Sequence, residues 1–589
     1  MSDQLAVASK LSQAAAPASR LYAAMILEQA PRALSLMDRE AMSPTAGCCD
    51  RTYWAWKFVD FPGARFQEAL CALSFLYATE IDGSRYYQNA RLLEWIGLGL
   101  RFWSSIQHRD GSFDEAYPFE RSLAATAFTT FYVGEALEFL GDELSRELRE
   151  KTHETMRRAG RWLARNDETH GFLSNHLAAA AAALHHVYRA TGDKAFANRS
   201  RYFLDKILDR QSSEGWYEEY DGADPGYQTH GSFYLARLWQ LNRDERLMKS
   251  LSRSMTFLAH FTHPDGSLGG EYASRNTQTY YPAAFEMFAS FDPVAARIAE
   301  TMRPSAPSGA AVGLRGVDVY NYFPCLNNLV FAWLACGERG DRVARKLDEP
   351  ARQPGLVWFP KAGLARVRHE GFDAYVGTAK GGVIKVFDRA RRKLVYSDCG
   401  YIGQLRNGRL IATQYQDHAR KVRVEPDRIE VEGEFLEASR PTMTPLRFTA
   451  FRLFTLSLGR LAGLGRWLKR RLVKVLIHDQ RAIRIHFKRI ITFDETGVSI
   501  RDELAGPDGE RVASMQWSEC FTTIHMGSSR YFIASELDEV SALDPVSGGE
   551  APRRIDPARI VAGVSLSRSV AFNHSEGAIQ VVFNDALKG

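Results

Sequence analysis

The stretch that decides the fold runs from Gly171 to Tyr234. It contains Ser174-Asn175-His176-Leu177, an alanine-rich run, and then Asp224-Pro225-Gly226-Tyr227-Gln228-Thr229-His230-Gly231-Ser232-Phe233-Tyr234. The alanine run predicts a long helix, because alanine has the highest helix propensity. Asn, His and Tyr suit the removal of a weakly acidic carbon proton beside a carboxylate, since an amide can hydrogen-bond the carboxylate while His and Tyr exchange protons. We therefore predict a catalytic trio of Asn175, His176 and Tyr234.

The pattern around this stretch is helical. Glycine-containing turns punctuate it at Gly111, Gly171, Gly215 and Gly266, which are 60, 44 and 51 residues apart. This spacing is typical of one helical hairpin per repeat. Between and around the turns, apolar residues recur every three or four positions across 64–80, 88–106, 119–140, 145–165, 174–191, 197–211, 229–241 and 246–261. We predict an N-terminal helical extension over 1–50 and an (α/α) toroid over 51–340.

The sequence pattern changes near Pro354, after a charged segment that links the helical part to the rest of the chain. Short runs with alternating apolar and polar residues then dominate, broken by turn residues, which indicates antiparallel strands. Examples are 364–368, 382–387, 421–424, 428–433, 483–487, 497–501 and 579–583. The chain is therefore predicted to be an α+β multidomain protein, with an antiparallel β-sandwich over 355–589 following the toroid.

Composition excludes several classes of protein. The 589 residues are 45% hydrophobic and 25% charged, with a formal net charge of +5, so a nucleic-acid partner is not expected. Seven scattered cysteines without a CxxC pair favour reduced buried thiols over a disulfide framework or a metal site. No cofactor motif stands out. Because residues 1–20 lack an apolar core and no long apolar run follows, we expect a cytoplasmic protein without a spanning helix.

One segment of the β domain is unusual. Residues 446–477 contain no Asp or Glu, and leucines at helical spacing line one face while basic residues line another. This predicts a basic amphipathic helix inserted in the sandwich, lying on an anionic membrane surface at the inner face of the membrane. The alternative is a helix packed on the sandwich with its basic face in solvent. The predicted membrane-contact residues are Arg466, Trp467, Lys469, Arg470, Arg471 and Lys474.

A helical toroid followed by a β-sandwich resembles the heparinase II/III-like polysaccharide lyases and the related alginate lyases. Three stretches carry the likeness: 174–177, 224–234 and the strand-like run 359–367. The resemblance implies that Asn175 neutralises a uronate carboxylate. It also implies that His176 and Tyr234 handle the C5 proton and the leaving oxygen during β-elimination.

The chain departs from this family at one place. Such lyases commonly carry a further His on an early sandwich strand, but the matching region here, 378–384, has none. His369 and His418 are the nearest replacements, and neither lies in the motif. A non-catalytic glycan-binding or assembly protein on the same scaffold is therefore the alternative hypothesis.

Further residues are candidates for binding an acidic polysaccharide or oligosaccharide. Arg275, in a polar loop, could hold a sugar carboxylate with two hydrogen bonds. The predicted substrate-binding set is Tyr227, His230, Arg237, Glu271, Arg275 and Asn276, with Arg65, Glu68 and Arg121 as weaker candidates that could equally be ion-pair partners. A third hypothesis is hydrolysis by paired carboxylates among Asp110, Asp114 and Glu115. Linkage to exopolysaccharide or lipid-linked glycan biosynthesis is expected from the compartment and the basic insertion.

Overall fold

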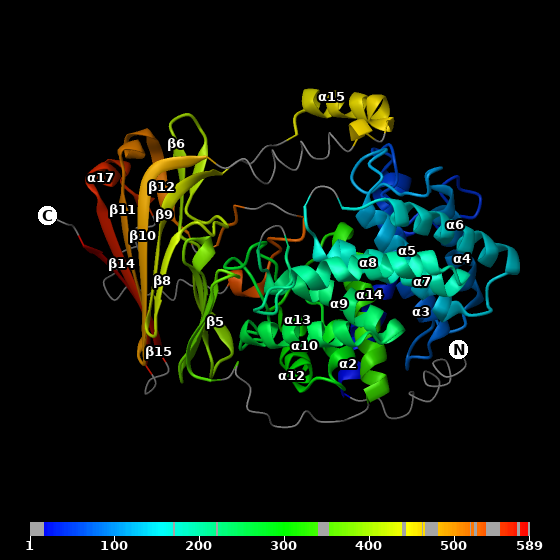
Figure 1. Ribbon diagram of the computed structural model, residues 1–589, viewed down its shortest axis with the longest axis horizontal. Coiled ribbons are helices and arrows are strands. Elements are labelled where there is room, and N and C mark those ends of the chain that lie inside the picture. The colour runs from blue at the N-terminus through cyan, green and yellow to red at the C-terminus, as the bar shows by residue number, and fades with distance from the viewer. Residues whose placement is uncertain are drawn as a thin grey trace.

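The computed structural model of the chain has a helical part and a part built of β-sheets, which lie side by side (Figure 1). The structure describes residues 17–168, 171–219, 222–339, 351, 353–438, 443–461, 463–465, 481–518, 520–523, 527–537, 554–573 and 578–586. The predicted fold class, a helical toroid followed by antiparallel sheets, is confirmed.

The helical part is a closed ring of hairpins. Its inner helices are α3 (Ala69–Ala78), α5 (Leu123–Leu140), α7 (Ser174–Thr191), α9 (Pro225–Asn242), α11 (Ala283–Phe288) and α14 (Val319–Arg339). Each inner helix contacts the next, and α14 returns to contact α3. The outer helices are α4 (Ala90–Ser105), α6 (Arg146–Arg165), α8 (Lys194–Arg210), α10 (Glu245–His260) and α12 (Pro293–Met302), followed by the short α13 (Ser305–Ser308).

The ring is completed by the N-terminal helix. α2 (Pro17–Leu36) packs against α14 and so supplies the outer partner of the last inner helix. The Tyr22 hydroxyl donates a hydrogen bond of 2.8 Å to Glu286, which anchors α2 to α11. Residues 17–36, which the sequence pattern places in a separate extension, therefore form part of the wall of the toroid.

The pattern of buried residues distinguishes the inner helices of the ring from the outer ones. α7 carries six consecutive alanines, Ala178–Ala183, that are all fully buried because the helix is surrounded by α5, α8 and α9. Small side chains let these backbones approach closely while keeping helix propensity high. The outer helix α6 instead buries one stripe and exposes its charged face, the ordinary pattern of a surface helix.

The repeated turns require glycine for a steric reason. Gly111 and Gly215 have φ angles of +98° and +101°. A Cβ at Gly111 would lie 2.3 Å from the carbonyl oxygen of Arg158, and one at Gly215 would lie 2.4 Å from that of Arg253. Each turn thus presses against the backbone of the next outer helix, which accounts for the recurrence of glycine in the sequence.

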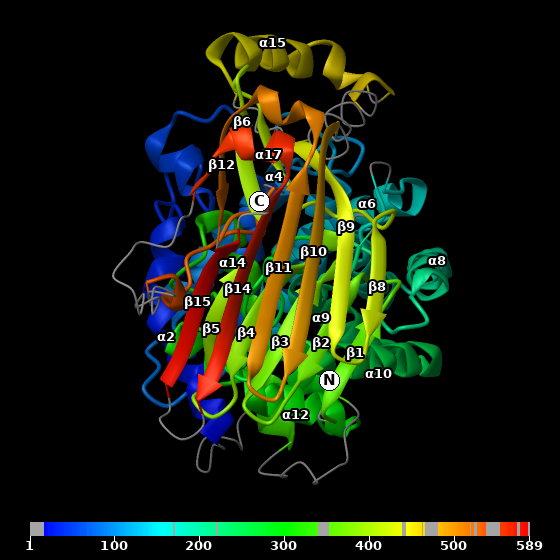
Figure 2. The ribbon, with the colours of Figure 1, turned by 90° about the vertical axis from the view of Figure 1, so that its left-hand side faces the viewer.

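The β domain contains two antiparallel sheets. The first has the order β1-β2-β3-β4-β5, and the second has the order β13-β12-β6-β7-β9-β10-β11-β14-β15, with β8 paired to β9. Figure 2 shows the second sheet facing the viewer, with the first behind it. The strands are β1 (Gly355–Phe359), β2 (Leu364–Arg368), β3 (Phe372–Gly377), β4 (Val383–Asp388), β5 (Lys393–Asp398), β6 (Tyr401–Leu405), β7 (Leu410–Ala412), β8 (Lys421–Glu425), β9 (Arg428–Ala438), β10 (Ala482–Asp494), β11 (Gly497–Ala505), β12 (Val512–Trp517), β13 (Arg554–Ile555), β14 (Val564–Asn573) and β15 (Ala578–Ala586).

Strand burial follows the layering. β3 and β4 are buried along their whole length, because the first sheet lies between the toroid and the second sheet (Figure 1). β10 alternates between exposed and buried residues, as expected for a sheet with one face in solvent. Inside the sandwich, Arg489 bridges Asp398 at 3.0 Å and Asp502 at 2.8 Å, and Arg568 contacts the same two carboxylates.

The insertion between β9 and β10 is helical where it is described. α15 (Pro445–Leu456) and the 3₁₀ turn Leu458–Arg460 extend over the edge of the toroid (Figure 1). The predicted membrane-contact residues, Arg466, Trp467, Lys469, Arg470, Arg471 and Lys474, lie outside the described residues. Within the described ranges, no helix combines the length and apolar character needed to cross a bilayer.

Candidate active site

The site begins at the N-terminus of α7. Leu173 occupies the N-cap position without a side-chain hydrogen bond, and the Ser174 hydroxyl donates to the carbonyl of Glu218. The free N–H of Asn175 instead donates to Glu219 Oε1 at 3.0 Å, so a carboxyl group from another loop satisfies this helix end. Burial raises the pKa of Glu219 to about 8, although Arg275 opposes the shift.

A small cavity lies beside this helix end. It is lined by Arg65, Phe128, Asn175, His176, Tyr227, His230, Thr279, Tyr281, Asn321 and Ser528. Its volume is about 40 Å³. This exceeds the roughly 10–15 Å³ of cavity volume that one water molecule needs, so the cavity has room for a small polar group such as a carboxylate. Ser528 belongs to the β domain, so both domains wall the site.

Asn175 is the most distinctive polar group in the cavity wall. Its Nδ2 atom donates a 3.3 Å hydrogen bond to the Tyr227 hydroxyl. Its Oδ1 atom is buried and has no hydrogen-bond partner among the described residues. Because an unsatisfied buried polar atom is costly, such a group is suited to a ligand that satisfies it. Rotation of the amide can present either a donor or an acceptor to that ligand.

His176 is oriented by a carboxylate. Its Nδ1 atom lies 2.8 Å from Oε2 of Glu168, and its ring meets Phe128 edge-on. A carboxylate at Nδ1 favours the tautomer with its proton there, which presents Nε2 as the basic nitrogen. The pair therefore has the geometry of a general base, His176, whose ring is oriented by a carboxylate, Glu168.

Tyr227 is positioned by the first turn of α9. Asp224 caps this helix by accepting from the Tyr227 N–H at 2.7 Å, and it also accepts from the Arg275 N–H at 2.7 Å. The Arg275 guanidinium lies 3.9 Å above the Tyr227 ring and 3.3 Å from Glu219. Burial raises the pKa of Tyr227 despite Arg275, so the hydroxyl is protonated at neutral pH. A protonated phenol in this position can act as an acid.

His230 lines the cavity, and Tyr234 lies behind it. The His230 ring stacks on Tyr281 at 4.5 Å, and its Nε2 lies 3.1 Å from the Tyr234 hydroxyl. Tyr234 is fully buried, pairs also with Tyr132, and does not line the cavity. Burial and the nearby Arg65 lower the pKa of His230 to about 3, which keeps this imidazole neutral.

Arg65 is the cation that lines the cavity. Its Nε bonds Glu68 at 2.7 Å, its Nη1 lies 3.2 Å from Glu115, and its guanidinium sits 4.8 Å from the centre of the Phe128 ring. Sequence analysis ranks Arg65 below the other candidates, yet it shares the cavity wall with Asn175 and His176. A partly buried arginine there can attract an anionic ligand, although Glu68 and Glu115 offset part of its charge.

Four predicted substrate-binding residues do not line the cavity, and one of them, Arg275, stacks on the Tyr227 ring. Arg237 is held by Glu135 through two hydrogen bonds of 2.7 and 2.8 Å between inner helices. Glu271 pairs with Lys385 at 2.6 Å, and Asn276 bonds Thr522 and Lys380. The last two residues therefore join the toroid to the β domain. Their polar groups are occupied by protein contacts, because the loop that carries them packs on the first sheet.

The region where the family commonly has a His contains a buried lysine instead. Lys380 donates to Asn276 Oδ1 at 3.1 Å, and burial lowers its pKa to about 8. His369 stacks on Phe372, and His418 bonds Gln416 at 2.9 Å. Neither histidine lines the cavity.

The carboxylates proposed for hydrolysis are engaged in other contacts. Asp114 accepts hydrogen bonds from His108 and from the N–H groups of Phe119 and Arg121. Asp110 pairs with Arg121 at 3.1 Å, and Glu115 pairs with Arg65. These contacts fix the loop after Gly111.

A wider groove adjoins the small cavity. It has a volume of about 800 Å³ and is lined by Arg109, Asp110, Phe119, Glu120, Arg121, Leu123, Glu154, Arg158, Arg161, Trp162, Arg165, Asn166, Asp167, Glu168 and Gly465. Arg109, Arg161 and Arg165 are exposed in it. Glu168 joins the two spaces, since it lines the groove and bonds His176 in the cavity wall.

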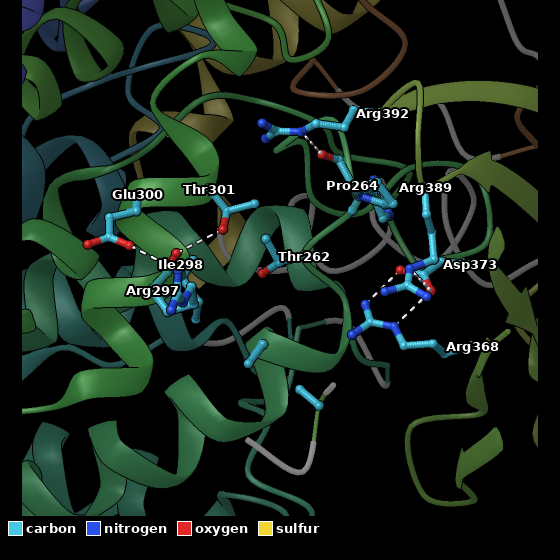
Figure 3. Close-up of a pocket in the computed structure, with 13 residues that line it drawn as sticks. Thr262, Pro264, Arg297, Ile298, Glu300, Thr301, Arg368, Asp373, Arg389 and Arg392 are labelled. Carbon is cyan, nitrogen blue, oxygen red and sulfur yellow. Dashed lines mark hydrogen bonds and ion pairs between the residues drawn. The ribbon is translucent and has the colours of Figure 1, made fainter. Parts of the chain in front are cut away.

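Another cavity, of about 470 Å³, lies where α10 and α12 meet the first sheet (Figure 3). Its arginines are held by protein groups: Arg368 pairs with Asp373 at 2.6 Å, Arg297 contacts Glu300, and Arg392 donates to the carbonyl of Pro264. None of the predicted site residues lines it.

Sequence reasoning missed several residues of the site. Glu168 and Glu219 bond His176 and Asn175, but they come from loops with no motif of their own. Asn321 and Ser528 reach the cavity from distant segments. Only Glu168 had a usable signal, because it lies two residues before the His170-Gly171 turn that opens the Asn175 motif.

Comparison with known proteins agrees with this architecture. Residues 61–285 match the family model of the ulvan lyase N-terminal domain. The chondroitin AC lyase of Streptomyces coelicolor A3, solved with chondroitin sulphate, superposes with a TM-score of 0.54 at 13% identity, over 88% of this chain and 71% of that chain. A Paenibacillus xanthan lyase gives 0.52 at 10% identity, over 87% and 48%. The curated proteins provide no match. The predicted resemblance to polysaccharide lyases with a toroid and a β domain is confirmed.

Proposed function

We propose that this chain, which has the fold of toroidal polysaccharide lyases, cleaves a uronate-containing glycan by β-elimination at the cavity beside Asn175. The observation that carries the proposal is the unsatisfied Asn175 amide in a cavity of carboxylate size, with a histidine and a tyrosine in the same wall. Arg65 adds a positive charge there. Together these groups meet the requirements of the reaction: a neutralised carboxylate, a base and an acid.

In this mechanism the Asn175 side chain rotates so that its amide nitrogen faces the cavity and donates a hydrogen bond to the uronate carboxylate, which spreads the charge that develops when the C5 proton leaves. His176, oriented by Glu168, takes that proton. The C5–H electrons form the C4–C5 double bond as the C4–O bond breaks, and the departing oxygen receives a proton. No water is consumed, and one product carries an unsaturated uronate.

The geometry supports Tyr227 over Tyr234 as the acid that protonates the leaving oxygen. The Tyr227 hydroxyl lies in the cavity wall within 3.3 Å of Asn175, whereas the Tyr234 hydroxyl is a layer deeper, bonded to His230 and Tyr132. In this assignment Tyr234 is a positioning residue that holds His230.

The wider groove supports a polymeric, acidic substrate. Exposed Arg109, Arg161 and Arg165 would pair with carboxylates or sulfates along the glycan. A link to exopolysaccharide or lipid-linked glycan assembly is part of the same proposal.

The test is ultraviolet absorbance during incubation with a panel of uronate polymers. We expect absorbance from the new conjugated uronate to rise for the wild type, and the rate to fall about 100- to 1,000-fold for Asn175→Ala. Lys361→Ala, on the exposed turn after β1, is the matched control and should keep the wild-type rate. A flat trace on every polymer, together with retained glycan affinity, would favour the non-catalytic binding protein.

A further inference from the structure

The insertion between β9 and β10 presents an unusual apolar surface. Eighteen large apolar side chains are exposed in the described part of the chain, and eight of them lie within residues 443–465. They are Met443, Leu446, Phe448, Leu453, Leu456, Leu458, Leu461 and Leu464. Clustered exposure of this kind marks an interaction surface, whereas single exposed apolar residues need no explanation.

The insertion is fixed on the toroid, so the orientation of its outer face is defined. Arg452 pairs with Asp60 at 3.2 Å, Phe451 packs edge-on against Tyr117, and the carbonyl of Arg460 accepts from Arg121 at 2.8 Å. These contacts hold one side of α15 against the toroid. The leucines remain on the side away from it, and α15 projects at the top of the molecule in both views (Figures 1 and 2).

A second segment extends this surface. Trp56 and Phe58 are 68% and 92% exposed, with exposed Lys57 between them. They lie at the end of a one-turn π-helix and only two residues before Asp60, which pairs with Arg452 of α15. We call residues 56–58 the tip. The tip and the insertion are therefore neighbours, although nearly 400 residues separate them in the sequence. We call this combined surface the apical patch.

The charge around the apical patch indicates its partner. Residues 443–465 of the insertion contain no acidic residue and three arginines, Arg447, Arg452 and Arg460. Arg447, Arg460 and Lys57 are exposed beside the leucines and the two aromatics. Aromatic and leucine side chains flanked by cations are typical of segments that insert shallowly into an anionic bilayer, where the apolar groups enter the headgroup region and the cations meet phosphates.

We propose that the apical patch docks the protein on an anionic phospholipid surface. The docking does not depend on the proposed enzymatic activity. It has one consequence that does rest on that function: Arg121 and Gly465 belong both to the wide groove and to the contact with the insertion, so docking would bring the groove close to the membrane. A lipid-linked acidic glycan would then reach the groove directly.

The experiment is co-sedimentation of the full chain with vesicles of phosphatidylcholine alone or mixed with phosphatidylglycerol. Two variants divide the patch: Leu453→Ser with Leu456→Ser on α15, and Trp56→Ser with Phe58→Ser on the tip. Each should lower the partition coefficient on mixed vesicles about tenfold or more, because each removes two inserting side chains. Leu537→Ser with Val561→Ser, which alters two exposed apolar residues elsewhere, should bind like the wild type.

Three outcomes would overturn the proposal. These are absence of wild-type binding to the mixed vesicles, equal binding to vesicles of phosphatidylcholine alone, and wild-type affinity in both patch variants. Light scattering tests whether a second copy of the chain occupies the patch instead. That would be the conclusion if the wild type is a dimer that does not bind vesicles and the patch variants are monomers. Unchanged circular dichroism and melting temperature of the variants would show that any loss is not a folding defect. Failure here would leave the lyase assay unaffected, so the two proposals are tested separately.

Discussion

The Asn175 amide nitrogen lies 3.3 Å from the Tyr227 hydroxyl oxygen, across 52 residues of sequence. Neighbouring inner helices of the ring, α7 and α9, bring the two groups together at their N-terminal ends. The contact places an amide that can bind a carboxylate beside a phenol that can donate a proton. The first two predictions below follow from this arrangement.

Removal of the two tyrosine hydroxyls should have different effects. Tyr227→Phe is expected to lower kcat about 100-fold or more, because it deletes the proposed acid. Tyr234→Phe should change kcat less than about tenfold and instead lower stability by about 1–2 kcal/mol, because its hydrogen bonds to Tyr132 and His230 are lost. Steady-state kinetics and thermal unfolding of both variants check this, and the reverse order of kcat losses would return the role to Tyr234.

Glu168 is expected to affect catalysis because it orients His176. Glu168→Gln is expected to lower kcat about 10- to 1,000-fold and to shift the pH profile of kcat/KM, since the amide no longer stabilises the protonated imidazole. Glu138→Gln is a matched control, because Glu138 pairs with Arg189 at 3.0 Å and lines neither the cavity nor the groove. Equal kinetics for the two variants would remove Glu168 from the mechanism.

The raised pKa of Glu219 predicts a pH dependence of stability. The folded chain keeps this proton up to about pH 8, whereas the unfolded chain releases it near its ordinary value of about 4.5. The folded state binds more protons between these values, so this group makes the free energy of unfolding fall as pH rises from about 4.5 to 8. Glu219→Gln should flatten that decline in denaturant titrations. Parallel curves for wild type and variant would contradict the assignment.

The ion cluster inside the sandwich should be essential for the stability of the β domain. Arg489→Met leaves Asp398 and Asp502 buried with Arg568 alone, and is expected to cost about 3–5 kcal/mol. Arg501→Met, which removes an exposed ion pair with Glu503 on the same strand, β11, should change stability by about 0.5 kcal/mol or less. Chemical unfolding of both variants measures the contrast, and a mild Arg489→Met phenotype would show that the remaining groups compensate.

The architecture could be predicted because its signals are local. The alanine run, the glycine turns and the alternating strands each reflect steric rules that act within a few residues, and the structure gives the reason in the close approach of Gly111 to Arg158. The sequence does not reveal that α2 completes the ring, because this depends on a contact between the two ends of the helical part.

The site could be predicted only where its residues share one short motif. Asn175 and His176 are adjacent in the sequence and meet at the cavity, and Tyr227 follows a recognisable helix cap. The choice between Tyr227 and Tyr234 depends on which turn of α9 faces the cavity, which periodicity alone does not determine. Arg237 resembles a ligand in sequence, but its long-range partner Glu135 has no pattern that would reveal the pair.

The most direct test of the account is mass spectrometry of the products from a uronate oligosaccharide of defined length, with wild type and Tyr227→Phe side by side. β-Elimination consumes no water, so the masses of the two products should add up to the mass of the substrate, and their formation should slow about 100-fold or more in Tyr227→Phe. Products whose masses add up to the substrate plus one water would show hydrolysis. That result would contradict elimination at the cavity beside Asn175.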